Sequence, residues 1–518
     1  MERLFLRTMT LGAFGTAFAL LGVSFTWEYY HDTPLLNYAG WLVAERGFVP
    51  YRDVFETSMP GIFAIHTLIA KTGLTTNFGF IALNAVLQLF VAGLAALLVR
   101  PISHWAALIT FGAVIGLTVI TGPTNIMQRD WFASIPISAA LLLALAPGRL
   151  GSGHRVFLIG ILFGCVATIK PQLALGAPVV VLAECFGRNP TRSFRSLAVR
   201  IAISLAGFSL VIVSTLLALA AIGALDGFFF LILEYLPLHI QQNGSREFLE
   251  VRATLVTRLL GALDKDRLYA LFVAVGFSAA GVVVWLRSAK KDQRIIVISL
   301  LGLSGTYALI PGISGQYWTY HYLPFIHLSA CLIAIFLATS VDIKLRPLRW
   351  ALRLAVLVAL AVNGWEWSLK NVKPHIFTEA KGGKVNEVAS ALRRWTPEGG
   401  KVQPYDWSGG IIHAMLREKI EIATPFMYAY HFLHHVYTPT NKELRGRMIE
   451  ALKVSRPDVF VWSKAEILPQ GFDTVQHFDE LERFVAECYH VVEDHDAFVV
   501  YLRNPSYDET EMACFVSR

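Results

Sequence analysis

Charged residues are scarce in this chain of 518 residues. Lysine, arginine, aspartate and glutamate make up 16% of the sequence and hydrophobic residues 55%, whereas soluble globular proteins carry about 25% charged residues. The mean hydropathy is +0.51. This composition excludes a soluble protein over the full length and predicts an integral membrane protein.

Several familiar signatures are also missing. The glycine pairs at 382–383 and 409–410 lack the spacing of phosphate-binding loops, so we interpret them as turns. The apolar run 11–26 has no small-residue cleavage site and leads into Trp27-Glu28-Tyr29-Tyr30, which predicts a retained first span with an aromatic interface belt. The net charge of +7 comes from short loops between apolar runs and does not indicate nucleic-acid binding.

The five cysteines say little about the class of protein. Cys165, Cys185 and Cys331 lie in apolar runs and are predicted to be packing residues. Cys488 and Cys514 lie in the polar C-terminal region. Either a disulfide between them or two separate thiols is compatible with the sequence.

Eleven apolar segments are predicted to cross the membrane, since a span needs about 20 apolar residues and shorter ones are tolerated inside a bundle. They are 10–27, 78–99, 103–122, 131–147, 155–170, 172–187, 198–223, 268–286, 294–313, 321–340 and 348–364. The block 155–187 is compatible with two short spans or with one long kinked helix. Segments 60–72 and 225–240 are predicted to be interfacial or re-entrant.

The positive-inside rule orients these spans. The basic loops contain Arg149, His154 and Arg155, then Arg188, Arg192, Arg195 and Arg200, then Arg287, Lys290, Lys291 and Arg294, and finally Lys344, Arg346, Arg349 and Arg353. Placing all four loops in the cytoplasm requires 155–187 to form a hairpin with Lys170 and Pro171 at its outer tip. The N-terminus then lies inside, and everything after Trp365 lies outside.

From about Lys370 the composition changes to that of a soluble domain. Helical periodicity is found in 382–396 and 441–454, and strand-like runs are found at 402–407, 459–462 and 498–502. The alternation predicts a small α/β domain. We therefore divide the chain into a membrane domain, 1–368, with an outer first loop at 28–60, and an extracytoplasmic domain, 369–518.

Polar residues are few at the predicted outer surface, and we expect them to converge on one face. They are His31, Asp32, Arg52, Asp53, Glu56, Gln128, Arg129, Asp130, Trp131, Lys170, His239, Arg246, Arg252, Arg258, Tyr317, Trp318, Tyr320 and His321. Carboxylates beside a bilayer are costly to desolvate, which favours chemistry, ion binding or transport as their role.

This set suits transfer from a phosphate-activated donor. Asp32 would act as a general base, and lysine or arginine would stabilise the departing phosphate. A divalent cation held by carboxylates is an alternative carrier of the phosphate. Structural interpretations also exist, because Asp32 precedes Pro34 as a helix cap would, and Arg129 with Asp130 would form an ion pair at a helix start. Lys170, alone between apolar runs, has only snorkelling as a structural explanation.

A family resemblance rests on several motifs together. They are Asp32, Gly47-Phe48-Val49-Pro50-Tyr51-Arg52-Asp53, Pro60-Gly61, Gln128-Arg129-Asp130, Ile169-Lys170-Pro171-Gln172 and Trp318-Thr319-Tyr320-His321-Tyr322-Leu323-Pro324. Over about residues 10–365 the chain resembles the integral-membrane GT-C glycosyltransferases. The nearest branch is the glycosyltransferase family 39 or PMT-like group, which includes protein O-mannosyltransferases and lipid A aminoarabinose transferases.

The resemblance implies a polytopic α-helical fold with a C-terminal α/β domain, in a bacterial inner membrane. It implies inverting transfer from a polyprenyl-phosphate sugar, on the outer face, to a lipid, glycan or protein acceptor. Asp32 and Asp130 would be the catalytic acids, with Lys170, Arg129 and His321 at the donor phosphate and Tyr51, Arg52 and Asp53 supporting the first loop. His31-Asp32 stands where many members have two acids, which leaves metal dependence open.

Two further hypotheses belong to other classes. A transporter or flippase of a lipid-linked precursor also needs charges among many spans, but no inverted repeat is visible and the charges lie at one face. A non-catalytic scaffold for envelope assembly is the third hypothesis. His431, His434 and His435 lie close in sequence, yet without supporting cysteine or carboxylate spacing they are better interpreted as ordinary surface or packing histidines than as a zinc site.

Overall fold

The computed structural model describes residues 2–28, 30–145, 150–187, 193–243, 268–314, 318–406, 408–464 and 477–505. The chain forms two compact units. The first comprises Met1–Trp27, Phe78–Leu217 and Glu250–Phe377, and the second comprises Glu28–Asn77, Ala218–Leu249 and Thr378–Arg518. The predicted first loop therefore belongs to the same unit as the C-terminal domain.

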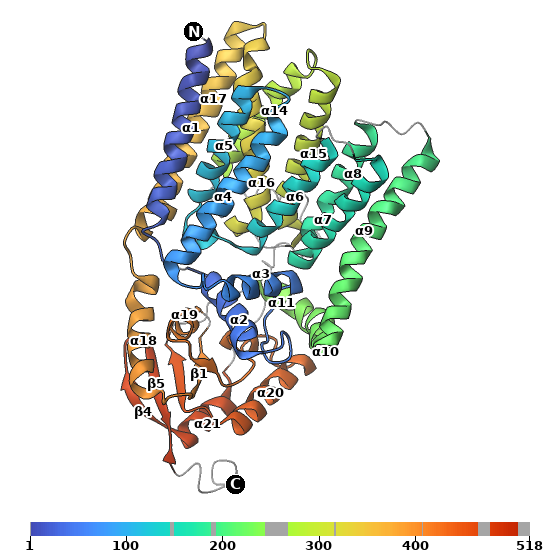
Figure 1. Cartoon of the computed structure of the whole chain (residues 1–518). Helices are drawn as coiled ribbons and strands as arrows, with labels where there is room; N and C mark the ends of the chain where they lie inside the picture. Colours follow the sequence, from blue (N-terminus) through green and yellow to red (C-terminus); the bar gives the residue numbers. More distant parts are fainter. Residues whose placement is uncertain are drawn as a thin grey trace. The chain divides into compact units, whose positions relative to one another are not determined.

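The first unit is a bundle of helices (Figure 1). They are α1 (Glu2–Ser24), α4 (Asn77–Val99), α5 (His104–Val119), α6 (Arg129–Leu145), α7 (Ser152–Ile169), α8 (Ala177–Phe186), α9 (Phe194–Ala221), α14 (Tyr269–Trp285), α15 (Lys291–Ser314), α16 (Leu323–Thr339) and α17 (Arg346–Trp367). Each of the eleven predicted spans falls on one of these helices. Among the described residues, seven helices are long and apolar enough to cross a membrane, and the others are shorter.

Helix α16 is the centre of this bundle. Every residue from Leu323 to Thr339 is buried, and the helix contacts α5, α6, α14 and α15. A helix that is apolar on all sides needs such a complete enclosure. The outer helices differ, since α9 exposes Leu205 and Leu217 and α17 exposes Val358, the surface expected of helices that face lipid.

Helices α7 and α9 approach closely through glycines. A Cβ on Gly160 would lie 1.9 Å from the carbonyl oxygen of Ser204, and one on Gly207 would lie 2.2 Å from that of Phe157. Side chains larger than hydrogen would push the two backbones apart. Close backbone contact through small residues is a usual means of joining helices in a membrane, where the hydrophobic effect between helices is weak.

The block 155–187 is a hairpin. Helix α7 ends at Ile169, Lys170 is extended with φ −154° and ψ 99°, and the 3₁₀ turn η2 (Pro171–Gly176) leads into α8. Helices α7 and α8 contact each other. Pro171 explains the break, because proline disfavours a helical conformation in the residue before it.

The second unit joins three stretches of the chain. The first loop supplies α2 (Thr33–Arg46) and α3 (Pro60–Lys71), which lie against each other. The segment after α9 supplies α10 (Leu225–Phe230), the π-helical turn η3 (Leu231–Tyr235) and α11 (Leu236–Asn243). The segments predicted to be interfacial or re-entrant, 60–72 and 225–240, thus fall in this unit.

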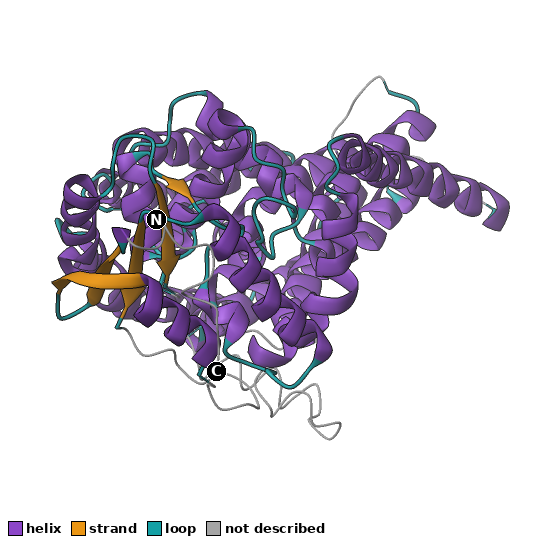
Figure 2. Cartoon of the chain, turned by 90° about the horizontal axis from the view of Figure 1, so that it is seen from below, coloured by secondary structure: helices purple, strands orange, loops and turns teal. Residues whose placement is uncertain are grey.

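The remainder of the second unit is the predicted α/β domain. Its helices are α18 (Lys384–Trp395), α19 (Gly410–Glu418), α20 (Pro439–Ser455) and α21 (Asp479–Cys488), and its strands are β1 (Lys401–Tyr405), β2 (Glu421–Ile422), β3 (Val459–Ser463), β4 (Tyr489–Asp494) and β5 (Phe498–Arg503). The strands, orange in Figure 2, form one sheet of order β2-β1-β3-β5-β4. Strands β2, β1 and β3 are parallel, whereas β5 is antiparallel to both β3 and β4.

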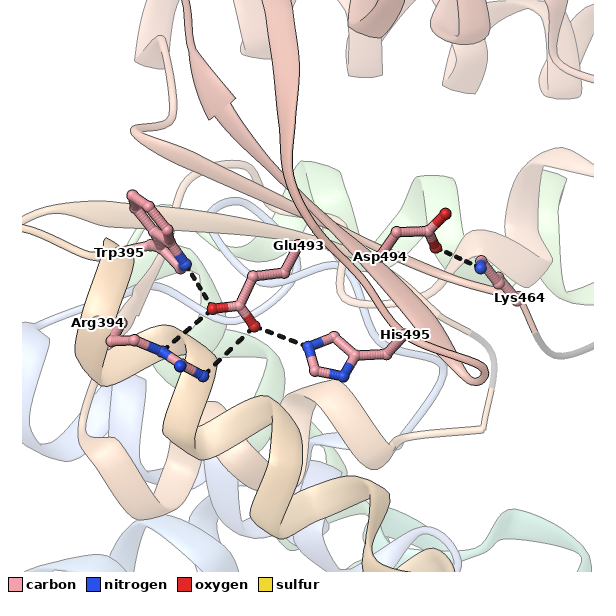
Figure 3. Close-up of polar contacts among 6 residues, drawn as sticks. All are labelled: Arg394, Trp395, Lys464, Glu493, Asp494 and His495. Atoms are coloured by element: carbon pink, nitrogen blue, oxygen red, sulfur yellow. Dashed lines mark hydrogen bonds and ion pairs between the residues drawn. The ribbon is translucent and has the colours of Figure 1, made fainter.

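A polar cluster fastens α18 to the edge strand β4 (Figure 3). Trp395 Nε1 donates to Glu493 at 2.7 Å, Arg394 lies 3.1 Å from the same carboxylate, and His495 Nε2 lies 2.7 Å from it. Burial would raise the pKa of Glu493, but the bonds from His495 and Trp395 and the charge of Arg394 hold it below its usual range. The neighbouring Asp494 pairs with Lys464.

The sequence analysis identified α18, α20, β1, β3 and β5 within a few residues but did not identify β2, β4, α19 or α21. Strand β2 has two residues, too few to show alternation. Strand β4 alternates poorly because it lies at the sheet edge and is largely exposed. Cys514 lies outside the described residues, so the proposed pairing of Cys488 with Cys514 extends beyond them. Several other predicted residues also lie outside, namely Arg149, Arg188, Arg192, Arg246, Arg252, Arg258 and Tyr317.

Candidate active site

Asp32 lies at the start of α2 but does not cap it through its side chain. Pro34 occupies the first turn, and Asp32 sits at the N-cap position with φ −80° and ψ −18° and no capping hydrogen bond from its carboxylate. Instead Asp32 Oδ1 lies 2.8 Å from Nδ1 of His31, and 23% of the Asp32 side chain is exposed. His31 itself has a left-handed φ of 58°.

The turn 49–54 braces the first loop through Asp53. This carboxylate accepts hydrogen bonds from Val49 N at 2.8 Å and from Arg52 Nε at 2.9 Å. The bond from Arg52, supported by that from Val49 and opposed by burial, holds the pKa of Asp53 below its usual range. The buried Tyr51 has a φ of 67° and donates its hydroxyl to Ser58 O at 2.8 Å. The turn that carries Asp53 is thus held by side-chain contacts within the first loop.

The carboxyl edge of the sheet holds a second carboxylate of this unit. Asp406 follows β1. The next strand in the chain, β2, lies on one side of β1, and the strand after it, β3, lies on the other side. Ligands of α/β sheets bind at such switch points. Asp406 accepts from Ser408 N at 2.9 Å and Ile411 N at 3.0 Å, and Lys384 Nζ lies 3.7 Å away.

Asp406 is almost wholly buried, and burial would raise its pKa. The Lys384 charge and the hydrogen bonds from Ile411 and Ser408 outweigh burial and lower the pKa of Asp406 below its usual range. Lys384 also donates to Ser463 Oγ at 2.7 Å, which links α18 to the end of β3. The end of β1 is thus occupied by a carboxylate that is bonded to backbone amides and lies close to one cation.

In the first unit, Asp130 and Lys170 form a buried ion pair. Lys170 Nζ donates to the two carboxylate oxygens of Asp130 at 2.7 and 2.6 Å. Asp130 is 0% exposed and Lys170 is 7% exposed. Asp130 opens α6 and Lys170 occupies the break after α7, so packing of these two helices brings the charges together. Each charge offsets much of the cost of burying the other.

The other predicted residues of this unit lie on neighbouring turns. The 3₁₀ turn η4 (Thr319–Tyr322) contacts α6, and the Tyr320 ring faces Lys170 Nζ at 5.8 Å. His321 is buried, with its ring edge-to-face with Tyr320 at 4.5 Å. Arg129 precedes Asp130 on α6. The structure therefore gathers Lys170 and Asp130 directly, with His321 adjacent through Tyr320.

Of the three histidines near 431, His431 and His434 are buried and His435 is partly buried. His431 lies against the Tyr235 hydroxyl and the Phe55 ring, and burial lowers the pKa of His431 to about 3, so it is neutral. Within the described part of the chain, no group of three or more histidine, cysteine, aspartate or glutamate side chains is arranged to hold a metal ion. Packing residues remain the simpler interpretation of these histidines.

Solved structures share this architecture, although no known family profile and no curated protein sequence matches the chain. ArnT from Cupriavidus metallidurans bound to undecaprenyl phosphate superposes with a TM-score of 0.56 at 14% identity, over 96% of this chain and 98% of that one. The apo form of ArnT gives 0.56 at 13% identity. The mycobacterial arabinofuranosyltransferase AftD gives 0.46 at 13% identity, over 96% of this chain and 40% of that one.

The chain is a multi-pass membrane protein with a GT-C glycosyltransferase fold. The resemblance inferred from several motifs together is confirmed at the level of the fold. Lys384 and Asp406, which lie close together at the end of β1, are charged residues that the sequence analysis did not single out. One signal was present, because Asp406 lies near the end of the predicted strand 402–407 and is followed by a glycine pair, the arrangement of a strand that ends in a turn.

Proposed function

We propose that this protein is a glycosyltransferase that moves a sugar from a polyprenyl-phosphate-linked donor to a cell-envelope acceptor on the outer face of the inner membrane. The observation that carries the proposal is the Asp32 carboxylate, placed at a helix start without capping it, in a fold shared with a protein that was solved bound to undecaprenyl phosphate. The acceptor would be a lipid, a glycan or a protein.

The proposed reaction is a single displacement. Asp32 accepts the proton of an acceptor hydroxyl, the hydroxyl oxygen forms a bond to the anomeric carbon, and the bond from that carbon to the phosphate oxygen breaks. The polyprenyl phosphate leaves with the electron pair, so the configuration at the anomeric carbon inverts. A positioned base and stabilised leaving group are the two contributions that such a step needs.

The remaining residues receive supporting roles in this proposal. Lys170, Arg129 and His321 are assigned to the donor phosphate, and Asp130 holds the Lys170 ammonium in place through its two hydrogen bonds. Asp53, with Arg52 and Tyr51, keeps the first loop in shape. The proposal also places the N-terminus in the cytoplasm and the C-terminal domain in the periplasm.

The first test is Asp32→Asn in the full-length protein reconstituted in vesicles. Transfer from a radiolabelled undecaprenyl-phosphate monosaccharide to membranes of a deletion strain is measured. We expect a loss of about 10²–10⁴-fold, the usual contribution of a general base, and thermal unfolding is measured alongside to show that the variant folds. Asp496→Asn, an exposed carboxylate of the same unit, is the matched control and should keep full transfer.

Two results would contradict the proposal. Full transfer by Asp32→Asn would remove the base assignment. Movement of the labelled sugar lipid across wild-type vesicles without any transfer would favour a flippase instead. Mass spectrometry of envelope lipids and glycans from the deletion strain would then identify the sugar and the acceptor together. The glycosylated product should disappear from this strain, and the unmodified acceptor should accumulate.

A further inference from the structure

Two arginines of α17 hold Glu2 at the end of the bundle where α1 and α17 begin. Arg353 is wholly buried, and its Nη2 donates to Glu2 Oε2 at 2.7 Å. Arg349 Nη2 lies 3.5 Å from the other carboxylate oxygen, and Arg349 Nη1 donates to Val341 O at 2.9 Å. One carboxylate thus meets two guanidinium groups, so this contact keeps a surplus of positive charge.

The guanidinium group of Arg353 is fixed on several sides. Its Nε donates to Ser340 Oγ at 2.8 Å, and its Cζ lies 4.2 Å from the centre of the Phe5 ring and 4.9 Å from that of Trp350. Arg349 Nε and Arg353 Nη1 have no hydrogen-bond partner among the described residues. An ordered pair of guanidinium groups that one carboxylate does not balance is suited to a second anion.

Further cations surround this contact, whereas acids are few. The exposed cations are Arg3 and Arg7 on α1 and Lys344 and Arg346 beside the start of α17. The acid between Ser340 and these cations, Asp342, accepts a hydrogen bond from Trp285 Nε1 at 3.0 Å. The positive-inside rule explains positive charge at this end, but it does not require an ordered geometry. This end of the bundle is therefore complementary in charge to an anionic lipid headgroup.

An apolar strip begins directly beside these cations. At four-residue spacing α17 carries the exposed side chains of Arg346, Trp350, Leu354 and Val358. Residues four apart lie on one face of a helix. Along this face a cation is followed by a tryptophan and then by two aliphatic side chains. A phospholipid presents its phosphate, its interfacial region and its acyl chains in the same order.

We propose that this face of α17 binds one anionic phospholipid, with its phosphate beside Arg346 and Arg349 and its acyl chains along Leu354 and Val358. Under the proposed orientation this lipid belongs to the cytoplasmic leaflet. The inference does not depend on the proposed activity. Because Arg349 also contacts Glu2 of α1, an occupied site stabilises the contact between the two helices.

The test measures lipid binding to the delipidated full-length protein by native mass spectrometry. Phosphatidylglycerol is compared with phosphatidylcholine of the same acyl chains, in wild type and in the double variant Arg346→Gln/Arg349→Gln. The matched control, Arg287→Gln/Lys290→Gln, removes two exposed cations from the loop between α14 and α15. Both pairs lie at the same end of the bundle, and both variants lose the same charge.

Wild type should bind the first phosphatidylglycerol at least about tenfold more tightly than phosphatidylcholine. Arg346→Gln/Arg349→Gln should lose about 10–30-fold in affinity for phosphatidylglycerol, the effect of two cations beside an anionic headgroup. The control Arg287→Gln/Lys290→Gln should keep the wild-type affinity. Arg346→Lys/Arg349→Lys keeps the charge but not the planar guanidinium groups, so its affinity should fall between those of the other two variants. Inorganic phosphate at the same concentration should not displace the lipid, because it gains nothing from the apolar strip.

Four outcomes would overturn the inference. Equal binding of the two lipids by wild type would show that apolar contact alone holds them. Unchanged affinity in Arg346→Gln/Arg349→Gln would remove the assignment of these arginines, and an equal loss in the control would indicate diffuse charge instead of a site. Displacement by inorganic phosphate would make this a site for a free anion. If the double variant does not fold, Arg346→Gln replaces it and is judged in the same way, since Arg346 is exposed and its loss leaves the Glu2 contact intact.

Discussion

The cost of burying a charged side chain in this protein depends on whether an oppositely charged partner is buried with it. Asp130 and Lys170 are both removed from solvent and satisfy each other through two short hydrogen bonds. An ion left alone in such a place loses its hydration without compensation. Surface pairs such as Lys401 with Glu421 keep their water and contribute little.

Lys170→Met should therefore destabilise the first unit by about 3–5 kcal/mol, because it leaves the Asp130 carboxylate buried and unpaired. Adding Asp130→Asn should recover part of this loss, since the double variant buries no net charge. Thermal unfolding in detergent micelles measures both effects. Lys401→Met is the control and should change stability by less than about 1 kcal/mol. A double variant as unstable as the single one would show that the pair itself is not the cause.

At the scale of elements, single polar contacts join helices to the ends of strands. Asp406 joins the end of β1 to the first turn of α19 through Ile411 N, and Lys384 joins α18 to the end of β3 through Ser463. A carboxylate at a helix N-terminus also interacts favourably with the helix dipole. The connection between β1 and α19 therefore depends on the charge of one side chain.

The lowered pKa of Asp406 makes this connection sensitive to acid. A carboxyl whose folded-state pKa is depressed stabilises the protein fully above its unfolded pKa, about 3.9, and loses that contribution as the pH falls through the folded value. Asp406→Asn should cost about 3–5 kcal/mol at pH 7, measured by hydrogen exchange of the α19 amides. The difference from wild type should shrink below about pH 4.

Asp494→Asn is the control for this effect. Asp494 forms an exposed pair with Lys464 in the same domain (Figure 3), so its loss should change stability by less than about 1 kcal/mol at any pH. A constant difference between Asp406→Asn and wild type from pH 7 to pH 3 would contradict the assignment of the lowered pKa.

At the scale of the whole molecule, the first loop folds with the C-terminal domain. Phe55 N donates to Pro425 O at 2.8 Å, and the Tyr38 hydroxyl donates to Ile420 O at 2.7 Å. The Phe55 ring also contacts that of Phe426, with centroids 5.5 Å apart. The loop that carries Asp32 is thus part of a packed core made with residues from the other end of the chain.

Phe426→Ala should loosen the first loop without affecting the membrane bundle. Removing a buried phenylalanine costs about 3–5 kcal/mol, so amide exchange in residues 48–58 should become faster by at least about 10²-fold. Exchange in α5 and α16 should not change. Val454→Ala, at a position that is 84% exposed, is the control. Unchanged protection of residues 48–58 would show that the loop is held independently of this contact.

Much of the fold could be read from the sequence because its causes are local. Apolar runs of sufficient length predicted the helices that span the membrane, and short β-branched and aromatic runs predicted β1, β3 and β5. The basic residues of the short loops, through the positive-inside rule, predicted the hairpin with Lys170 and Pro171 at its tip. In each case the decisive residues are neighbours along the chain, so their physical effect needs no knowledge of distant segments.

The sequence by itself determined a polytopic membrane protein with a C-terminal α/β domain, and it singled out Asp32. Only the tertiary structure decided which charges meet. Asp130 and Lys170 are 40 residues apart and pair because α6 and α7 pack together, while the Glu28 carboxylate accepts from Ala380 N because the first loop and the C-terminal domain share one compact unit. Hydropathy and periodicity show which faces of each segment favour water and which favour an apolar environment. They contain no information about which distant segments will bury their polar groups against one another.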